Sequence, residues 1–230
     1  MNIYGLQKVT LLDYPGTVAC TVFTAGCNFR CPFCHNKSLV TEIAGGASIL
    51  EADFFSFLEK RKAVLDGVCI TGGEPLLQPD MEEFLGKIKE RGYLVKLDTN
   101  GSFASSLKNL VSKGLVDYVA MDIKNSIDRY PETVGLDICN TKDIEESVDF
   151  LLRGSIPYEF RTTVVGEFHD KESFIKIAQW IESPERYFLQ GFIDSENVIK
   201  GGLSAYSPEK LEEFAEILRE KMPFVEIRGL

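Results

Sequence analysis

Two patterns of apolar residues, one typical of strands and one typical of helices, alternate along this chain. Short, mostly apolar runs, typical of buried strands, are followed by segments in which apolar residues recur at i, i+3, i+4 and i+7, as on one face of a helix. The clearest helical pattern holds Met81, Phe84, Leu85 and Ile88, and Gly92 follows as its stop signal. The apolar runs predict strands at 17–25, 68–71, 93–97, 116–121, 158–165 and 186–192, each followed by a helix.

Capping signals mark where some of these helices begin. A helix is expected from about Ser48, because Ser48 and Glu51 have the spacing of a capping box. The last helix opens with Ser207 as its N-cap and Pro208 in its first turn.

The order of the elements predicts an α/β fold. Six strand–helix units in series imply parallel strands joined by right-handed crossovers. Eight such units close a full barrel of about 250 residues, so six leave it incomplete. An incomplete (β/α)6 TIM-like barrel and an open doubly wound sheet both fit. Residues 1–16 are expected to form a short N-terminal hairpin or arm with its turn at 13–16, and 224–227 a short final strand. No linker rich in Pro, Gly or Ser divides the chain, which predicts a single domain over 1–230.

Composition narrows the class of protein. The chain has 230 residues, of which 44% are hydrophobic, enough for one sizeable core. Basic residues number 25 against 35 acidic ones, giving a net charge of -10, and no lysine or arginine block is present, which argues against nucleic-acid binding. No apolar run approaches the length of a membrane span, and no signal-peptide core follows Met1. We therefore expect a soluble, cytoplasmic protein that binds neither nucleic acid nor membrane.

Three thiols stand close together directly after the first strand. Cys27, Cys31 and Cys34 have the spacing C-x3-C-x2-C, with Gly26 and Pro32 at the corners of the loop. A loop this short can wrap its thiols around one compact object, and a cuboidal iron–sulfur cluster is such an object. Iron in these clusters is usually held by four thiolates. Three local ligands therefore leave one iron with a position at which a small molecule can bind.

Other roles for the cysteines are less well matched to the spacing. A disulfide framework suits a small secreted chain, and a structural zinc site usually has two separated ligand pairs, whereas His35 directly follows Cys34. Cys20, Cys69 and Cys139 lie in apolar or mixed surroundings and are expected to be buried small hydrophobic residues.

Unusual polar or glycine-rich clusters follow or close five of the six predicted β/α strands, and a sixth cluster, 161–163, lies within the fifth strand. In a barrel of parallel strands, ligands bind where the strands end, on the loops leading into the helices. The clusters are the cysteine loop, 72–75, 98–101, 121–124, 161–163 and 190–192. Turn chemistry alone explains one or two of them, so together they favour a ligand site.

The cysteine loop resembles that of a known superfamily. C-x3-C-x-aromatic-C, with Phe33 as the aromatic residue, is similar to the signature of the radical S-adenosylmethionine (SAM) enzymes. Asp13-Tyr14-Pro15-Gly16 followed by the stretch 26–36 resembles the glycyl-radical-enzyme activases, most closely the activating proteins of anaerobic ribonucleoside-triphosphate reductase. Because this family has a partial (β/α)6 barrel, the resemblance favours the barrel over the doubly wound sheet.

The resemblance implies cofactors, partners and a reaction. Cys27, Cys31 and Cys34 would hold a 4Fe–4S cluster whose fourth iron chelates SAM. One electron from the cluster would cleave SAM to a 5′-deoxyadenosyl radical, which abstracts a Cα hydrogen from a glycine of a partner, expected to be anaerobic ribonucleotide reductase. A flavodoxin- or ferredoxin-type protein would supply the electron.

The same resemblance assigns the strand-end residues to SAM. Gly72, Gly73, Glu74 and Pro75 match the family's GGEP motif, in which carbonyls and the carboxylate accept from the SAM ammonium; a plain turn is the alternative. Lys124 and Arg161 are expected to neutralise the SAM carboxylate, or else to form ordinary salt bridges. Gln190 is assigned to the same site, although some activases have a histidine there. Phe33 and Phe192 are expected either against adenine or in the core.

Three further oxygen donors lie at adjacent predicted strand ends: Asp98, Thr99 and Asp122. Hard cations take such ligands, and in the activases matching residues surround a monovalent cation beside SAM. Hydrogen bonds to the SAM ribose, or capping of the next helix, are the alternatives.

No acid–base pair is visible, so the chemistry is expected at the cluster and SAM. His35 is expected to orient the cysteine loop or tune the cluster potential, and His169, in a polar turn, to be solvated. Asp13 and the segment 125–139 are expected to meet the partner. Two other functions stay open: a radical SAM enzyme acting on a small molecule, such as a 7-carboxy-7-deazaguanine synthase, and a non-catalytic iron–sulfur electron carrier, which would need every iron ligated by protein.

Overall fold

The structure is a computed structural model that describes residues 1–42 and 48–229. The chain forms two compact units. The first unit holds 1–28, 38–99 and 105–119, and the second holds 29–37, 100–104 and 120–230.

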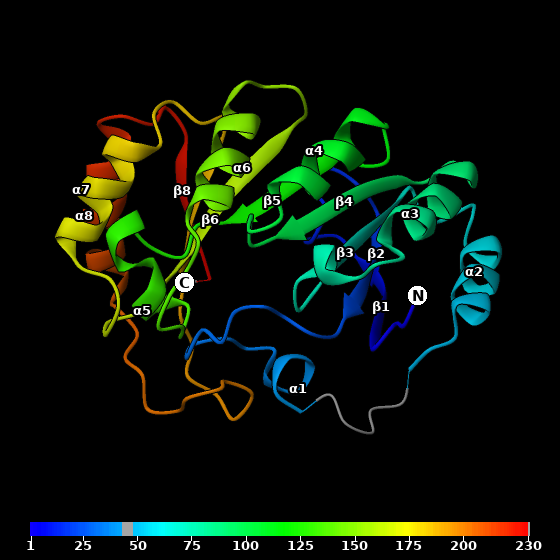
Figure 1. Cartoon of the computed structure of the whole chain (residues 1–230), viewed down its shortest axis with the longest axis horizontal. Coiled ribbons are helices and arrows are strands. Elements are labelled where there is room, and N and C mark those ends of the chain that lie inside the picture. The colour runs from blue at the N-terminus through cyan, green and yellow to red at the C-terminus, as the bar shows by residue number, and fades with distance from the viewer. Residues whose placement is uncertain (43–47, 230) are drawn as a thin grey trace. The chain divides into compact units, whose positions relative to one another are not determined.

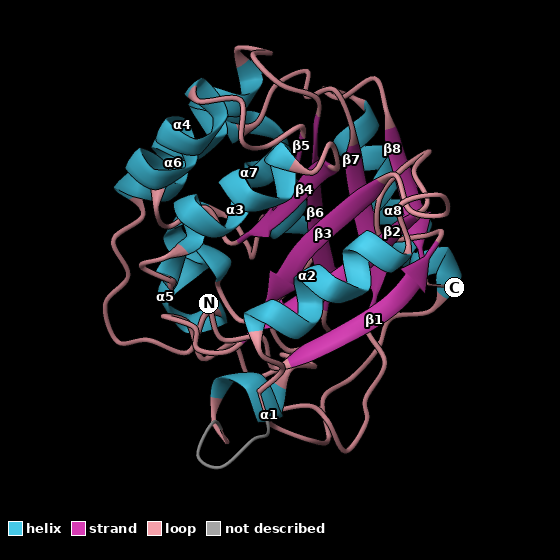
Figure 2. Cartoon of the chain, turned by 90° about the vertical axis from the view of Figure 1, so that its right-hand side faces the viewer, coloured by secondary structure: helices cyan, strands magenta, loops and turns pink. Residues whose placement is uncertain are grey.

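Four strands form the sheet of the first unit: β1 (Gly5–Thr10), β2 (Ala19–Thr24), β3 (Gly67–Gly72) and β4 (Leu94–Thr99). β1 pairs antiparallel with β2, which confirms the predicted N-terminal hairpin (Figure 2). β2, β3 and β4 are parallel, with Cys69 opposite both Thr21 and Lys96. The parallel strands are almost wholly buried, as expected for strands covered on both faces.

Helices α2 (Glu51–Lys60), α3 (Met81–Glu90) and α4 (Ala104–Ser112) accompany these strands. Phe54 and Phe55 of α2 pack against Phe84 of α3, with ring centroids 5.5 and 5.7 Å apart. The predicted cap at Ser48 is wrong, because α2 begins at Glu51 with Leu50 as its N-cap residue. Ile49 forms a bridge with Ile3, and its N–H donates to the Ile3 carbonyl at 2.7 Å, so the chain is still extended there. The short elements α1 (Lys37–Val40) and η1 (Pro75–Leu77) complete this part of the chain.

The second unit contains the end of β5 (Tyr118–Asp122), then β6 (Tyr158–Val164), β7 (Tyr187–Gly191) and β8 (Val225–Arg228). β6, β7 and β8 are parallel neighbours. Beyond β5, the Ile123 N–H donates to the Arg161 carbonyl of β6 at 2.8 Å. The strand β8, paired with β7, confirms the predicted short final strand.

Two long helices pack together in the second unit, α7 (Lys171–Trp180) and α8 (Pro208–Arg219) (Figure 1). Phe174 and Phe214 stack between them with ring centroids 4.6 Å apart. The Ser207 side chain caps α8 with Pro208 in its first turn, as predicted. The remaining elements are η2 (Ile127–Arg129), α5 (Tyr130–Thr133) and α6 (Lys142–Leu152).

Strand order follows chain order within each unit, and all strands after the hairpin are parallel where their pairing is defined. This is the arrangement of β/α units in series that the sequence predicts. Within the described residues, no helix combines the length and the apolar character needed to cross a bilayer.

Candidate active site

Cys27 follows β2 in the first unit. The preceding Gly26 has a φ of 88°, a left-handed conformation suited to glycine. Its N–H donates to the Leu39 carbonyl at 2.8 Å, and the side chain of Gln78 donates to the Ala25 carbonyl at 2.7 Å. The end of β2 is therefore fixed from two sides, and the direction in which the chain leaves toward Cys27 is set.

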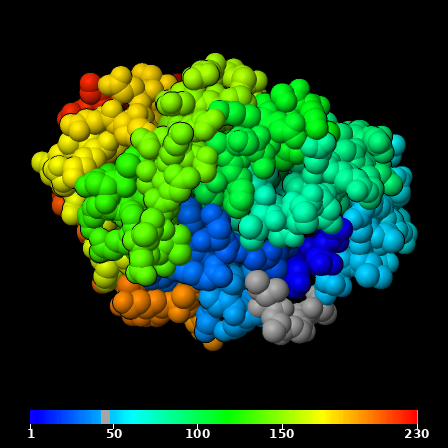
Figure 3. All heavy atoms as spheres, viewed as in Figure 1, coloured from blue at the N-terminus to red at the C-terminus, as the bar shows by residue number. Residues whose placement is uncertain are grey.

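Cys31 and Cys34 lie in the second unit, in a tight turn in which the Cys34 N–H donates to the Cys31 carbonyl at 3.0 Å. Cys31 is buried and Cys34 is half-buried. All six cysteines of the chain, including half-buried Cys139, are thiols. In the space-filling view, the segment that carries the cysteine loop reaches the surface (Figure 3).

The segment 193–200, after β7, runs along this part of the cysteine loop. The Lys200 N–H donates to the Pro32 carbonyl at 2.8 Å, and the Ile199 N–H donates to the Cys34 carbonyl at 3.2 Å. His35 Nε2 lies 2.7 Å from the carbonyl oxygen of Ile193 and donates to it. The predicted role of His35 in orienting the loop agrees with these contacts.

Both predicted aromatic residues are buried in the second unit. Phe33 packs against Phe168 and His169, with ring centroids 5.6 and 6.3 Å apart. Phe192 packs against His35 at 5.4 Å. These contacts anchor the cysteine loop, and an adenine contact stays a prediction for both residues.

The glycine pair of the 72–75 motif is packed against the end of β2. A Cβ on Gly72 would lie 2.3 Å from the Thr24 carbonyl oxygen, and one on Gly73 would lie 1.9 Å from that of Gly26. The Gly73 N–H donates to the Thr24 carbonyl at 2.9 Å, and the Glu74 N–H donates to the Gly26 carbonyl at 2.8 Å. Only glycine fits this close approach, which joins the motif to the residue before Cys27.

Glu74 is fully buried. Its Oε1 accepts from the Leu76 N–H at 3.0 Å and from the Thr99 hydroxyl at 2.9 Å. Pro75 begins η1 directly after it. The structure thus brings Glu74 and Thr99 together, and their contacts with SAM stay a prediction.

Asp98 has a partner that sequence reasoning missed. Lys96 Nζ forms an ion pair with Asp98 Oδ1, and the Lys96 side chain is only 1% exposed. A signal was available, because Lys96 and Asp98 are two residues apart on one strand and so share a face.

Asp122 ends β5 and lies between two cations of the second unit. Arg161 Nε donates to Asp122 Oδ1 at 2.9 Å, and its Nη2 forms an ion pair with the same oxygen at 2.9 Å. Lys124 Nζ donates to Oδ2 at 3.0 Å. Burial alone would raise the pKa of Asp122, but the charges of Arg161 and Lys124 lower it to about 2. The salt bridges considered for Lys124 and Arg161 are therefore present. Gln190 lies on β7, where its Oε1 accepts from Thr163 at 3.5 Å.

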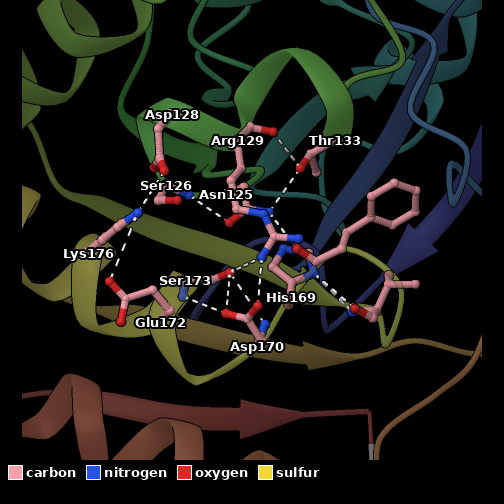
Figure 4. Close-up of polar contacts among 12 residues, drawn as sticks. Asn125, Ser126, Asp128, Arg129, Thr133, His169, Asp170, Glu172, Ser173 and Lys176 are labelled. Atoms are coloured by element: carbon pink, nitrogen blue, oxygen red, sulfur yellow. Dashed lines mark hydrogen bonds and ion pairs between the residues drawn. The ribbon is translucent and has the colours of Figure 1, made fainter.

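The expectation that His169 is solvated is wrong. Its ring is 1% exposed, and burial lowers its pKa to about 4. Around it, Asn125 donates to the Thr133 hydroxyl at 2.9 Å and to the Phe168 carbonyl at 2.8 Å (Figure 4). The neighbouring Asp170 caps α7 and accepts from Arg129 at 3.0 Å, so the polar residues after His169 face their own partners and not the ring.

The donor chemistry of the cysteine loop fits an iron–sulfur cluster. Three thiols within one short loop supply the ligands that such clusters use. The charges of Cys31 and Cys34 contribute to a raised pKa of Lys124, although its burial opposes this and Asp122 is the largest favourable influence. The Lys124 ammonium thus lies near two of the three proposed ligands, where it would compensate the charge of cluster-bound thiolates.

Comparisons with known proteins agree with these features. A family model described as the radical SAM superfamily matches residues 21–181. A Methanocaldococcus jannaschii protein, provisionally named glycyl-radical enzyme activating enzyme, is 34% identical over 196 residues, covering 83% of this chain and 79% of its own. A pyruvate formate-lyase-activating enzyme of Clostridium pasteurianum is 32% identical over 129 residues, 54% of this chain and 52% of its own.

Solved structures share the fold. Streptococcus suis SuiB bound to its precursor peptide SuiA superposes with a TM-score of 0.69 at 15% identity, over 91% of this chain and 48% of its own. The chain thus spans about half the length of SuiB. This likeness, with the parallel strand order, confirms the predicted class of incomplete α/β barrel.

Proposed function

Because the chain belongs to the radical SAM superfamily, we propose that it activates a glycyl-radical enzyme and that its partner is an anaerobic ribonucleoside-triphosphate reductase. The activating role follows the relatives that match most of its length. The choice of the reductase follows the resemblance of the residues around Asp13 and the cysteine loop to that group of activases.

One observation carries the proposal. Gly73 and Glu74 are hydrogen-bonded to the backbone at Thr24 and Gly26, immediately before Cys27. The acceptors suited to an ammonium are therefore built onto the strand end that carries the first cysteine. An electron carrier with every iron ligated by protein has no use for this arrangement.

Four residues at strand ends of the first unit are assigned to the SAM ammonium, directly or through Glu74. The carbonyls of Gly72 and Gly73 accept from the SAM ammonium, and buried Glu74 supplies the compensating negative charge. Thr99 holds Glu74 by donating to its Oε1. Cys27, Cys31 and Cys34 would hold a 4Fe–4S cluster, which would supply the electron for reductive cleavage of the SAM sulfonium. The chain itself supplies binding, orientation and exclusion of water.

Lys124 and Arg161 serve the opposite end of the amino-acid part of SAM. Arg161 donates to Asp122 Oδ1 and Lys124 donates to Oδ2. Both side chains are cations of the kind that pairs with a carboxylate. Asp122 prevents the two cations from repelling each other when the site lacks the ligand. We assign Gln190 to the same end through its amide, which lies near Thr163.

Two exposed apolar positions are candidates to meet the partner. Leu12, on the turn before Asp13, is 89% exposed, and Ile138, in the segment after α5, is 87% exposed. Asp13 itself accepts from the Thr21 hydroxyl at 2.5 Å, which fixes the turn on β2. A flavodoxin- or ferredoxin-type donor would approach where the cysteine loop reaches the surface.

The test is anaerobic reconstitution with iron and sulfide, followed by reduction with SAM in the presence of a candidate enzyme. We expect an organic radical signal on the anaerobic ribonucleotide reductase by electron paramagnetic resonance, with 5′-deoxyadenosine formed in proportion. A signal on pyruvate formate-lyase alone would leave the activating role and overturn the choice of partner. SAM turnover with a small heterocycle and no protein partner would support the small-molecule enzyme, and no binding of SAM would support the electron carrier.

A further inference from the structure

The first unit contains a buried charge pair whose lysine has not been given a role. Lys96 and Asp98 lie on β4, and Lys96 Nζ contacts Asp98 Oδ1. The Lys96 side chain is 1% exposed and that of Asp98 is 14% exposed. The pair is thus almost completely removed from water.

Cys69 of β3 completes the surroundings of this pair. It is the register partner of Lys96, and its Sγ lies 3.9 Å from Lys96 Nζ and 3.8 Å from Asp98 Oδ1. The prediction that Cys69 is simply a buried hydrophobic residue is therefore incomplete. The sulfur is a weak hydrogen-bond acceptor for the ammonium.

A buried lysine on a strand of apolar residues is unusual. Lysine is almost never fully buried unless it is paired, and removing two charges from water costs free energy that the pair only partly returns. Val95 and Leu97, its neighbours on β4, are both fully buried apolar residues. An apolar residue would fit the strand pattern at 96, so the ammonium is explained by the carboxylate that it holds.

Asp98 is also the carboxylate for which the sequence predicts a monovalent cation, together with Thr99 and Asp122. The donor set does not fit such an ion. Asp98 Oδ1 already forms an ion pair with the Lys96 ammonium. In the second unit, Asp122 forms ion pairs with two cations, Arg161 and Lys124. A second cation at Asp98 would lie close to the Lys96 ammonium inside the protein, where charge repulsion is weakly screened.

We propose that the Lys96 ammonium is the resident cation of this site. It neutralises Asp98 and fixes the orientation of the carboxylate at the end of β4, the end at which SAM is proposed to bind. Lys96 is in this sense a positioning residue, and the protein binds SAM without an alkali cation. The consequence for SAM rests on the proposed function, whereas the replacement of the ion does not.

The experiment compares wild type with Lys96→Met in chloride salts of tetramethylammonium, sodium and potassium at one ionic strength. Two quantities are measured on the cluster-loaded protein without oxygen: the dissociation constant of SAM and the midpoint of thermal unfolding. Wild type is expected to give the same values in all three salts. Lys96→Met is expected to bind SAM about tenfold more weakly in tetramethylammonium, about 1.4 kcal/mol, and to recover in potassium or sodium with a saturable rise of the unfolding midpoint.

Two variants serve as controls. Lys89→Met removes another lysine of the first unit from an aspartate, Asp117 at 2.6 Å, but at a partly exposed pair away from the site, and should not respond to the choice of salt. Lys96→Met combined with Asp98→Asn removes both charges and should lose the response that the single variant gains.

The outcomes are separable. A saturable gain in wild-type unfolding midpoint or SAM affinity with sodium or potassium would overturn the proposal, and so would a Lys96→Met protein that is folded but indifferent to the salt. If Lys96→Met does not fold in any salt, the wild-type comparison still decides. If wild type fails to bind SAM, the proposed function fails, while the unfolding midpoints continue to test the replacement of the ion.

Discussion

His169 Nε2 lies 2.8 Å from the carbonyl oxygen of Lys124, while its Nδ1 accepts from the Val165 N–H at 3.1 Å. The second contact leaves the ring proton on Nε2, so the neutral imidazole donates to Lys124. The Lys124 N–H in turn donates to the Tyr130 hydroxyl at 3.0 Å. The backbone of Lys124 is therefore held on both sides, which fixes the base of the side chain that pairs with Asp122.

The buried imidazole makes stability depend on pH. Burial lowers the pKa of His169 from 6.5 to about 4, so between these values the unfolded chain binds a proton that the folded chain does not. Its contribution is fully present above pH 6.5, falls as the pH is lowered toward 4, and changes no further below that. The total loss is about 3 kcal/mol, at 1.36 kcal/mol per pKa unit. Urea unfolding at a series of pH values from 4 to 7 measures it.

His169→Phe is the matched variant for this effect. It fills the space beside Phe174 but leaves the Lys124 carbonyl without its ring donor, so we expect a loss of about 1–3 kcal/mol at pH 7. The difference in free energy of unfolding between wild type and the variant should shrink as the pH falls from 6.5 to 4. A difference that stays constant across this range would contradict the neutral buried imidazole.

Asp122→Asn should be destabilising. Arg161 and Lys124 would be left close together without the carboxylate between them. Because the Asp122 side chain is 31% exposed, we expect about 1–3 kcal/mol, less than the loss for a fully buried pair. Burial opposes ionisation, yet the two cations lower the pKa of Asp122 from 3.8 to about 2. Its contribution to stability is therefore present above pH 3.8 and is lost only as the pH falls toward 2. Chemical unfolding of wild type and Asp122→Asn at pH 7 measures the loss of stability.

Glu213→Gln is a suitable control for Asp122→Asn. Glu213 forms a salt bridge with Lys210 in which both side chains are largely exposed, 60% and 42%. Exposed pairs of this kind contribute little to stability because water and salt screen them. If the two substitutions lowered the free energy of unfolding equally, the Asp122 ion pairs would contribute no more than an exposed surface pair.

Local patterns were enough to predict most of the framework. Buried strands read as apolar runs, and the cap of α8 at Ser207 involves only neighbours in sequence. The cap expected at Ser48 failed because Ile49 pairs with Ile3, a contact that joins distant parts of the chain. The residues next to a helix start do not indicate whether they pair with a distant segment, so this contact could not be predicted from them.

The site shows the same division between local and distant effects. The glycines at 72 and 73 were found because close backbone approach demands glycine. Burial of His169 was missed because its immediate neighbours are polar, and its ring is drawn inward by Lys124, 45 residues away in sequence. The pairing of Lys96 with Asp98 is local, but only the structure shows that the lysine is buried.

Gly73→Ala should disrupt the motif that is assigned to SAM. Its Cβ would lie 1.9 Å from the Gly26 carbonyl oxygen, a backbone atom that cannot move without breaking the hydrogen bond to Glu74. We expect a loss of about 2–4 kcal/mol in stability and a loss of SAM binding. Gly86→Ala is the control, since nothing lies near its Cβ and it is within α3. Alanine there should stabilise the protein by about 0.5–1 kcal/mol.

Cys34→Ser should prevent assembly of the cluster, whereas Cys139→Ser should not. Cys34 is half-buried in the turn held by the Ile199 N–H, and its thiolate is one of the three proposed ligands. A serine hydroxyl is a much poorer ligand for iron in such clusters, which are held by thiolates. Cys139 is equally half-buried but lies outside the loop, and burial raises the pKa of its thiol. Iron and sulfide per chain, with the visible absorption of the reconstituted proteins, measure the outcome. Full iron content in Cys34→Ser, or its loss in Cys139→Ser, would mean that the ligand set has been assigned wrongly.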